Sequence, residues 1–305
     1  MGFSLIEVTL RTFNYNYCPC MLNKLKTNRG PLSNDINLSS DPYLIWRPKP
    51  NCHPFNSQGM RGRDVDVNDG KNEYYILAVG DSHTCGPIDS PSWVFYLEEL
   101  LNRDKFGVKV INAGVWGYSS FQMLRRFKEC LEYSPQMALV TWCSNDALPT
   151  SIPDKDYVAS KKFFDYSLKL RLSHLLWAFH DKLLSKINVK QPVMPRVGLE
   201  EYGGYLKEII SLAKKNNIEV ILLTRPYIGE AGINYAFDWK KVAPTYNQLT
   251  IRTAKANNLI SIDIYSYFRD REQYFTDESH LTDEGYKLVA KIVYDHLKDA
   301  ISRKE

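Results

Sequence analysis

The sequence has no run of eighteen apolar residues, so no segment is expected to span a bilayer. It also lacks the basic start and apolar core of a signal peptide, because Glu7 interrupts residues 1–10 and a polar stretch follows. Neither a Gly-x-Gly-x-x-Gly nor a Gly-Lys-Ser/Thr loop is present, which argues against nucleotide phosphate binding. We therefore expect a cytoplasmic protein, or an envelope-associated one if an N-terminal anchor is missing from the sequence.

An excess of charge of one sign is also absent. The 305 residues contain 39 Lys and Arg and 35 Asp and Glu, a formal net charge of +4. No nucleic-acid surface is expected, and the expected partner is a small molecule or a glycan ester. The 6 cysteines are scattered in a chain that needs no disulfides, so we interpret most of them as buried thiols. Cys18-Pro19-Cys20 lacks the spacing of a zinc site, and no metal is expected.

The first 73 residues differ from the rest of the chain. They show little periodicity and are rich in Asn, Asp, Pro and Ser, which predicts an extended N-terminal arm. The apolar cluster at 43–46 is a candidate for packing on the core. Residues 74–305 are predicted to form one domain. It is interrupted at about 147–198 by an irregular insertion with a helix near 168–184. Whether that insertion is a lid or a structural flap stays open.

Residues 74–305 alternate between strand and helix patterns. Short apolar runs predict five strands, at 74–79, 108–111, 137–141, 219–223 and 259–264. Apolar residues at helical spacing predict helices between and after them, near 92–102, 121–131, 206–213, 242–257 and 282–297. This alternation implies right-handed crossovers and a parallel sheet, hence a three-layer α/β fold.

Open parallel sheets bind ligands beyond the carboxyl ends of their strands. That rule selects the loops at 80–86, 112–118, 142–146 and 276–281. Ser82 follows the first strand and is a candidate nucleophile, whereas Gly-Asp-Ser alone is commonly a simple turn. A serine attacks an ester at neutral pH only with the help of a base. His280 is the best candidate, since Asp277 lies three residues before it and can orient its ring.

The other polar groups of these loops suggest an oxyanion hole. The Asn145 side-chain amide and the Gly117 N–H can join the Ser82 N–H around a developing negative charge. Each group also has an ordinary interpretation, because Asn-Asp pairs often form turns and Asp277 with His280 could simply open the last helix. Their occurrence together, in order and at strand ends, favours the catalytic interpretation.

Further side chains are candidates for contacting a substrate. Arg225 ends the fourth strand and could bind a substrate anion, although surface pairing is the more ordinary use of an arginine. His83 follows the nucleophile and is expected to line the pocket. Trp116, Tyr118 and Trp142 either stack on a sugar face or belong to the core.

The four loops resemble the sequence blocks of the SGNH (GDSL-type) hydrolases. Gly80-Asp81-Ser82 resembles block I, Gly117 block II, Asn145-Asp146 block III, and Asp277-x-x-His280 block V. The resemblance covers roughly residues 74–300. It implies a flavodoxin-like, five-stranded parallel sheet, no metal or organic cofactor, and an acyl-enzyme on Ser82. Cys143 departs from the family's block III glycine, and its side chain is a candidate for crowding the pocket or shifting Asn145.

We therefore expect a serine esterase that removes a small acyl group from a carbohydrate, and acetyl is the favoured group. The expectation of a carbohydrate substrate is based on the N-terminal arm. Its stretch from Asp41-Pro42 to Trp46-Arg47 resembles the leader of bacterial members that act on glycans. Two alternatives remain. One is an O-acyltransferase with the same triad, and the other is a carbohydrate-binding member with weak catalysis. Acyl length and oligomeric state stay open.

Overall fold

The structure is a computed structural model, and it describes residues 2–16, 37–66, 74–104, 107–167, 169–184, 194–228 and 239–302. Cys18-Pro19-Cys20 lies outside the described residues. The predicted division between residues 73 and 74 falls next to 67–73, which also lie outside them, so the domain boundary stays a prediction.

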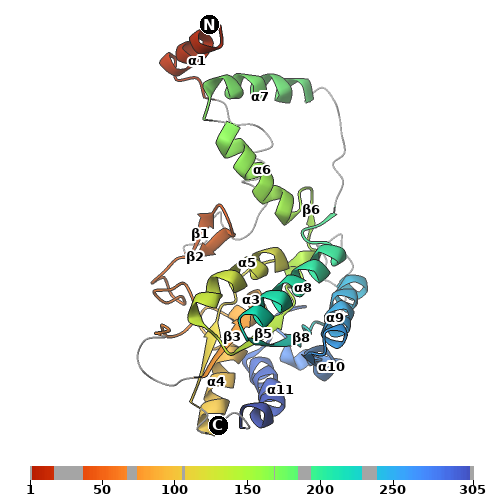
Figure 1. Ribbon diagram of the computed structural model, residues 1–305. Coiled ribbons are helices and arrows are strands. Elements are labelled where there is room, and N and C mark those ends of the chain that lie inside the picture. The colour runs from red at the N-terminus through yellow and green to blue at the C-terminus, as the bar shows by residue number, and fades with distance from the viewer. Residues whose placement is uncertain are drawn as a thin grey trace.

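A five-stranded parallel sheet forms the centre of the molecule (Figure 1). Its order is β4-β3-β5-β8-β9, which confirms the predicted flavodoxin-like α/β/α fold. The bounds are β3 Tyr74–Val79, β4 Val108–Asn112, β5 Met137–Thr141, β8 Glu219–Leu223 and β9 Ile260–Ile262. Three of these strands match the predicted ranges, because continuous apolar runs are typical of strands buried on both faces.

Helices cover both faces of the sheet. Along β3, Leu77 and Val79 pack into one apolar cluster, while Ile76 and Ala78 pack into the other, as the two-residue period of a strand requires. The first cluster is covered by α5 Ser120–Cys130, α8 Leu199–Lys215 and α9 Trp239–Ala256. The second is covered by α4 Trp93–Arg103 and α11 Asp283–Ser302. Short helices join the strands: α3 Ser82–Cys85, α10 Ile264–Phe268, η2 Leu131–Tyr133, η3 Ser144–Ala147 and η4 Glu272–Tyr274.

The N-terminal arm is more structured than its composition predicts. It contains α1 Gly2–Thr12 and the antiparallel pair β1 Leu38–Asp41 and β2 Ile45–Pro48. Trp46 is fully buried, and its indole N–H donates to the Trp116 carbonyl at 3.1 Å. The candidate cluster at 43–46 therefore does pack on the core, beside the loop that carries Gly117.

The insertion projects from the carboxyl edge of the sheet (Figure 1). A short antiparallel ribbon forms its base, with β6 Pro149–Thr150 paired to β7 Met194–Pro195. Beyond it lie α6 Asp154–Ser167 and α7 Arg171–Leu184. The expected helix near 168–184 corresponds to α7, whereas α6 was not expected. In the part of the chain that the structure describes, no helix is long and apolar enough to cross a membrane.

Candidate active site

Ser82 stands at the end of β3, on the first turn of α3. Close backbone approach makes this loop possible: a Cβ on Gly80 would lie 2.3 Å from the Thr84 hydroxyl, and one on Gly114 would lie 2.4 Å from the Cys85 nitrogen. Only glycine fits at such distances. Gly80 therefore lets the chain turn tightly into α3, and Gly114 lets the loop after β4 pack directly against the loop that carries Ser82.

Ser82, His280 and Asp277 form a continuous chain of polar contacts. The Ser82 Oγ lies 2.9 Å from His280 Nε2, and His280 Nδ1 lies 2.7 Å from Asp277 Oδ2. The other oxygen of Asp277 accepts the N–H groups of Ser279 at 2.9 Å and of His280 at 2.8 Å. An ionised Asp277 accepts from Nδ1–H, which leaves Nε2 free to receive the serine proton.

Asp277 is held in its ionised form. Burial alone would raise the pKa of this carboxyl, but hydrogen bonds from the Ser279 backbone and from His280 outweigh burial and lower the pKa below its ordinary value of 3.8. The carboxylate is therefore charged at neutral pH. It can stabilise the imidazolium that forms when His280 takes a proton.

Asn145 lies on η3, after β5. Its side-chain nitrogen donates to Asp81 Oδ2 at 3.2 Å and to the Tyr118 carbonyl at 3.1 Å. Both amide hydrogens are therefore engaged within the protein. The N–H groups of Ser82 and Gly117, in contrast, make no hydrogen bond to another described residue. Gly117 has a φ of 73°, a conformation that favours glycine.

Comparison with known proteins identifies the family. A model of the GDSL-like Lipase/Acylhydrolase family matches residues 78–288, more than half of the chain. The chain belongs to this family. It is accordingly a hydrolase of carboxylic ester bonds. A search among curated proteins gives no significant match.

Several solved structures share the fold of this GDSL-like hydrolase. A lipase/acylhydrolase from Enterococcus faecalis is 19% identical with a TM-score of 0.53, covering 74% of this chain and 96% of that one. The acetyl xylan esterase AlAXEase is 17% identical with a TM-score of 0.51, covering 73% and 99%. A variant acetyl-xylooligosaccharide esterase from Geobacillus stearothermophilus is 18% identical with a TM-score of 0.50, covering 72% and 92%. At these identities the similarity shows the fold alone.

Arg225 of this GDSL-like hydrolase is buried, so its expected pairing at the surface is wrong. It is 1% exposed, and its guanidinium pairs with the fully buried Asp81. A second nitrogen donates to the Ser279 carbonyl at 3.3 Å, next to His280. Asp81 also accepts the Ser144 N–H at 2.9 Å. The pair therefore ties together the loops that carry Ser82, Asn145 and His280, and the charge of Arg225 is matched inside the protein.

Other expected substrate contacts belong to the interior. Tyr118 is fully buried, and its hydroxyl donates to the Trp46 carbonyl at 2.9 Å. Trp142 is 1% exposed and stacks on Tyr246 at 4.8 Å, so only its rim borders the cleft. For both side chains the core interpretation holds. Trp116 is half-buried, and its indole N–H donates to the Gly86 carbonyl at 2.8 Å beside the cleft.

His83 is also interior, so the expectation that it lines the pocket is wrong. It is 1% exposed, and neither ring nitrogen has a hydrogen-bond partner among the described residues. Burial and the nearby Arg225 charge lower its pKa well below 6.5, so the ring is neutral. Because successive residues of α3 point in different directions, Ser82 faces the cleft while His83 faces Tyr286 in the core.

Cys143, which departs from the family pattern, does not crowd the site. Its thiol is fully buried, and its sulfur lies 3.8 Å from the Met123 sulfur. Burial raises the pKa of this thiol well above its ordinary value, so it is neutral and unreactive. The side chain points into the core, and its neighbours Ser144 and Asn145 line the cleft.

Two hollows meet at Ser82 and His280. The smaller, of about 160 Å³, extends toward Asn145 and Tyr227. The larger, of about 530 Å³, extends past Trp116. The smaller hollow lies below the range of roughly 300–1,000 Å³ that pockets for drug-sized molecules span, and the larger hollow lies within it.

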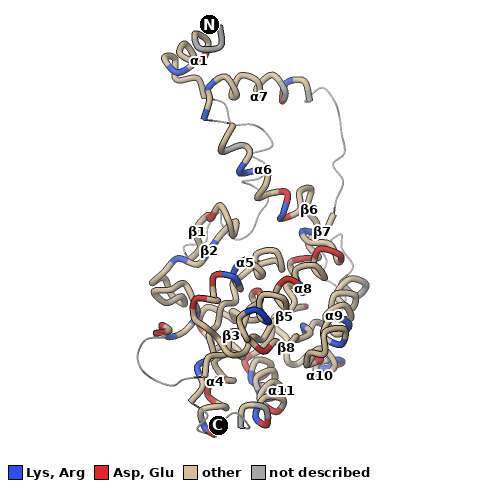
Figure 2. Tube along the Cα trace, in the orientation of Figure 1, with Lys and Arg blue, Asp and Glu red and all other residues tan. Residues whose placement is uncertain are grey.

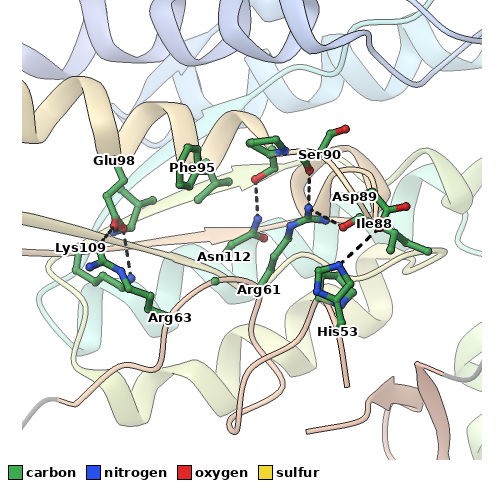
Figure 3. A pocket seen from close by; sticks show the side chains of 16 residues that line it. His53, Arg61, Arg63, Ile88, Asp89, Ser90, Phe95, Glu98, Lys109 and Asn112 are labelled. Carbon is green, nitrogen blue, oxygen red and sulfur yellow. Dashed lines mark hydrogen bonds and ion pairs between the residues drawn. The ribbon is translucent and has the colours of Figure 1, made fainter. Parts of the chain in front are cut away.

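A separate groove of about 600 Å³ lies where the N-terminal arm crosses the domain (Figure 3). Arg61 reaches across it and donates to the Ser90 carbonyl at 2.6 Å. On the other side of the groove, the Glu98 carboxylate forms ion pairs with the Arg63 guanidinium at 3.1 Å and the Lys109 ammonium at 3.6 Å. Ser82 does not line this groove. The groove adjoins the larger of the two hollows at Ser82, and the two share the lining residues Ile88 and Ser90.

Sequence reasoning missed the residues that support the site. Arg196 pairs with the buried Asp154 at 2.8 Å and donates to the Gly117 carbonyl at 2.9 Å, so the base of the insertion holds the Gly117 loop. No local pattern marks this contact, because 42 residues separate the two ionic partners. The position of Arg225 in the sequence, in contrast, could have predicted an internal ion pair. A cation directly after a buried strand at the carboxyl edge of a sheet needs a partner inside the protein.

Proposed function

We propose that this GDSL-like hydrolase removes a small acyl group from a carbohydrate hydroxyl through an acyl-enzyme on Ser82. Acetyl is the favoured acyl group. The observation that carries the proposal is the chain from Ser82 Oγ to His280 and Asp277, at 2.9 and 2.7 Å, beside a hollow of about 160 Å³. The acetyl xylan esterases that share the fold support an acetylated sugar as the first substrate to test.

In the acylation step, Ser82 Oγ attacks the ester carbonyl while His280 Nε2 takes the hydroxyl proton. The bond from the acyl carbon to the sugar oxygen then breaks, and His280 returns the proton to that oxygen. Water repeats the sequence on the acyl-enzyme, which releases the carboxylic acid and restores Ser82. Asp277, kept ionised by its hydrogen bonds, stabilises the imidazolium in both steps.

The N–H groups of Ser82 and Gly117 and the amide of Asn145 are the proposed oxyanion donors. Because both amide hydrogens of Asn145 are engaged, this side chain donates once its bond to the Tyr118 carbonyl is exchanged for one to the oxyanion. Removing one oxyanion donor typically costs about 3 to 4 kcal/mol of transition-state stabilisation.

Hydrolysis of p-nitrophenyl acetate, butyrate and octanoate, together with acetate release from acetylated xylo-oligosaccharides, tests the proposal. We expect the acetyl substrates to be preferred. Labelling by a fluorophosphonate, mapped by mass spectrometry, should occur on Ser82 and be absent in Ser82→Ala. A preference for octanoate would contradict the small acyl group, and transfer to a sugar acceptor without hydrolysis would identify an acyltransferase.

A further inference from the structure

Exposed apolar side chains gather on the part of the molecule farthest from the sheet. We call this part the helical projection, and it comprises α1, α6 and α7 (Figure 1). Among the described residues, 17 large hydrophobic side chains are exposed, and 11 of them lie on or directly beside these helices: Leu5, Ile6, Val8, Phe13, Phe163, Tyr166, Leu170, Leu175, Leu176, Phe179 and Leu183. Such concentration marks an interaction surface, whereas scattered exposed residues do not.

The exposed residues of α7 form one continuous stripe. Leu175, Leu176, Phe179 and Leu183 are 43%, 62%, 70% and 55% exposed, and their spacing places them within about 100° of arc around the helix axis. The opposite side of α7 contacts α6, where Trp177 packs edge-on against Phe163 at 6.2 Å. The stripe therefore faces away from the packing that holds the helix in place.

α1 is attached to α7 by polar contacts and leaves its apolar side chains outside. The Glu7 carboxylate accepts the N–H groups of Arg171 at 2.9 Å and Leu172 at 2.8 Å, at the start of α7. Leu5, Val8 and Phe13 are nevertheless 73%, 56% and 80% exposed. An isolated helix of 11 residues is marginal in water, so a partner that covers these side chains would stabilise it.

Charge distinguishes the helical projection from the rest of the chain. Its described residues, 2–16, 154–167 and 169–184, contain 7 Lys and Arg against 5 Asp and Glu, a formal charge of +2. The other described residues contain 23 against 24, a charge of −1. Helical spacing places Arg171 and Lys182 along one border of the α7 stripe. Figure 2 shows both cations and anions along α6 and α7.

We infer that the helical projection docks on the surface of an anionic lipid bilayer, with its apolar side chains at the acyl boundary and its cations among the headgroups. Amphipathic helices with leucines and aromatics on one side and Lys and Arg beside them bind lipid in this way. A second copy of the chain is the competing occupant, and the experiment below distinguishes it from a bilayer. The β6–β7 ribbon and the Arg196–Asp154 pair would then connect the docked helices to the domain that carries the cleft.

Co-sedimentation of the full chain with vesicles tests the inference. We expect binding to phosphatidylcholine vesicles that contain about 30% phosphatidylglycerol, weaker binding to pure phosphatidylcholine, and release by about 0.5 M salt. The double variant Leu176→Asp/Phe179→Asp should bind at least about tenfold more weakly, because it places two charges on the apolar stripe. The matched control Phe95→Asp/Tyr267→Asp, at exposed positions outside the helical projection, should bind like the unmodified chain.

A second variant guards against a folding defect. Lys161→Glu/Lys182→Glu leaves the apolar stripe intact and should weaken binding to the anionic vesicles alone. Hydrolysis of soluble p-nitrophenyl acetate reports the active site separately in every variant. Absence of vesicle binding by the unmodified chain, or equal vesicle binding by Leu176→Asp/Phe179→Asp and its control Phe95→Asp/Tyr267→Asp, would overturn the inference. So would a dimer that Leu176→Asp/Phe179→Asp dissociates in the absence of vesicle binding.

Discussion

At the carboxyl edge of the sheet, charged side chains are buried, and in the helical projection, apolar side chains are exposed. Asp81 and Arg225 are 0% and 1% exposed, whereas Phe179 and Phe13 are 70% and 80% exposed. Burying a charge without a partner and exposing apolar side chains to water are both unfavourable in free energy. At the sheet edge the cost is offset by hydrogen bonds that join three loops. In the helical projection nothing within the described residues offsets it, so the compensation we infer comes from outside.

The largest expected effect is at the nucleophile. Ser82→Ala should reduce kcat for p-nitrophenyl acetate by at least about 10⁴-fold, because the proposed acyl-enzyme cannot form. The exposed Ser57→Ala is the matched control and should keep its activity. Near-normal turnover by Ser82→Ala would remove the basis for treating this edge as the active site.

Breaking the buried ion pair tests how much the sheet edge depends on it. Arg225→Met leaves the Asp81 carboxylate without its cation and should lower the free energy of unfolding by about 3 kcal/mol or more. The control Arg63→Met breaks an exposed pair with Glu98 and should change it by less than about 1 kcal/mol. Urea unfolding measures both. Similar losses in the two variants would argue against a special role for burial.

Asp146 makes stability at this edge depend on pH. Burial raises the pKa of this carboxyl to about 7 in the folded state, from an ordinary value of 3.8. The folded state therefore binds a proton at Asp146 more tightly than the unfolded state does. The stability that this proton contributes is lost as pH rises from about 4 to 7. Asp146→Asn should gain stability relative to the unmodified chain over this range, by up to about 4 kcal/mol. A difference that does not change with pH would contradict the raised pKa.

The smallest effect is expected in the helical projection. Glu7→Gln weakens the contacts with the N–H groups of Arg171 and Leu172. Hydrogen exchange at these two amides should become faster while the global unfolding midpoint stays the same, because few contacts join α1 to the rest of the molecule. Glu208→Gln, at the exposed pair with Lys128, is the control and should leave both amides unchanged. A lower midpoint in Glu7→Gln would mean that α1 is part of the cooperative core.

The strands and the order of the loops follow from local pattern. The apolar runs at 74–79, 137–141 and 219–223 predict β3, β5 and β8 because such strands are buried on both faces. α1 was missed for the opposite reason. Helix prediction from periodicity relies on a face that packs on a core, and α1 has almost no such face. Its placement depends on Glu7, whose partners lie 164 and 165 residues away.

Cys143 shows why one residue of the site could not be interpreted from the motif alone. The motif places it beside Asn145, but the direction of its side chain depends on the backbone at the start of η3. That backbone turns the sulfur toward Met123 and leaves Asn145 at the cleft. Neighbouring residues in a turn can face opposite sides, as Ser82 and His83 also do.

The parallel α/β fold, the four loops and the family can be predicted from the amino-acid sequence, because each depends on short patterns whose order places them at one edge of a sheet. The pairing of Arg225 with Asp81 and the interior positions of Tyr118 and Trp142 are seen only in the folded molecule. The same is true of the exposed surface that the apolar residues of the helical projection share. Burial and pairing depend on contacts between residues far apart in the chain, and no local pattern specifies them.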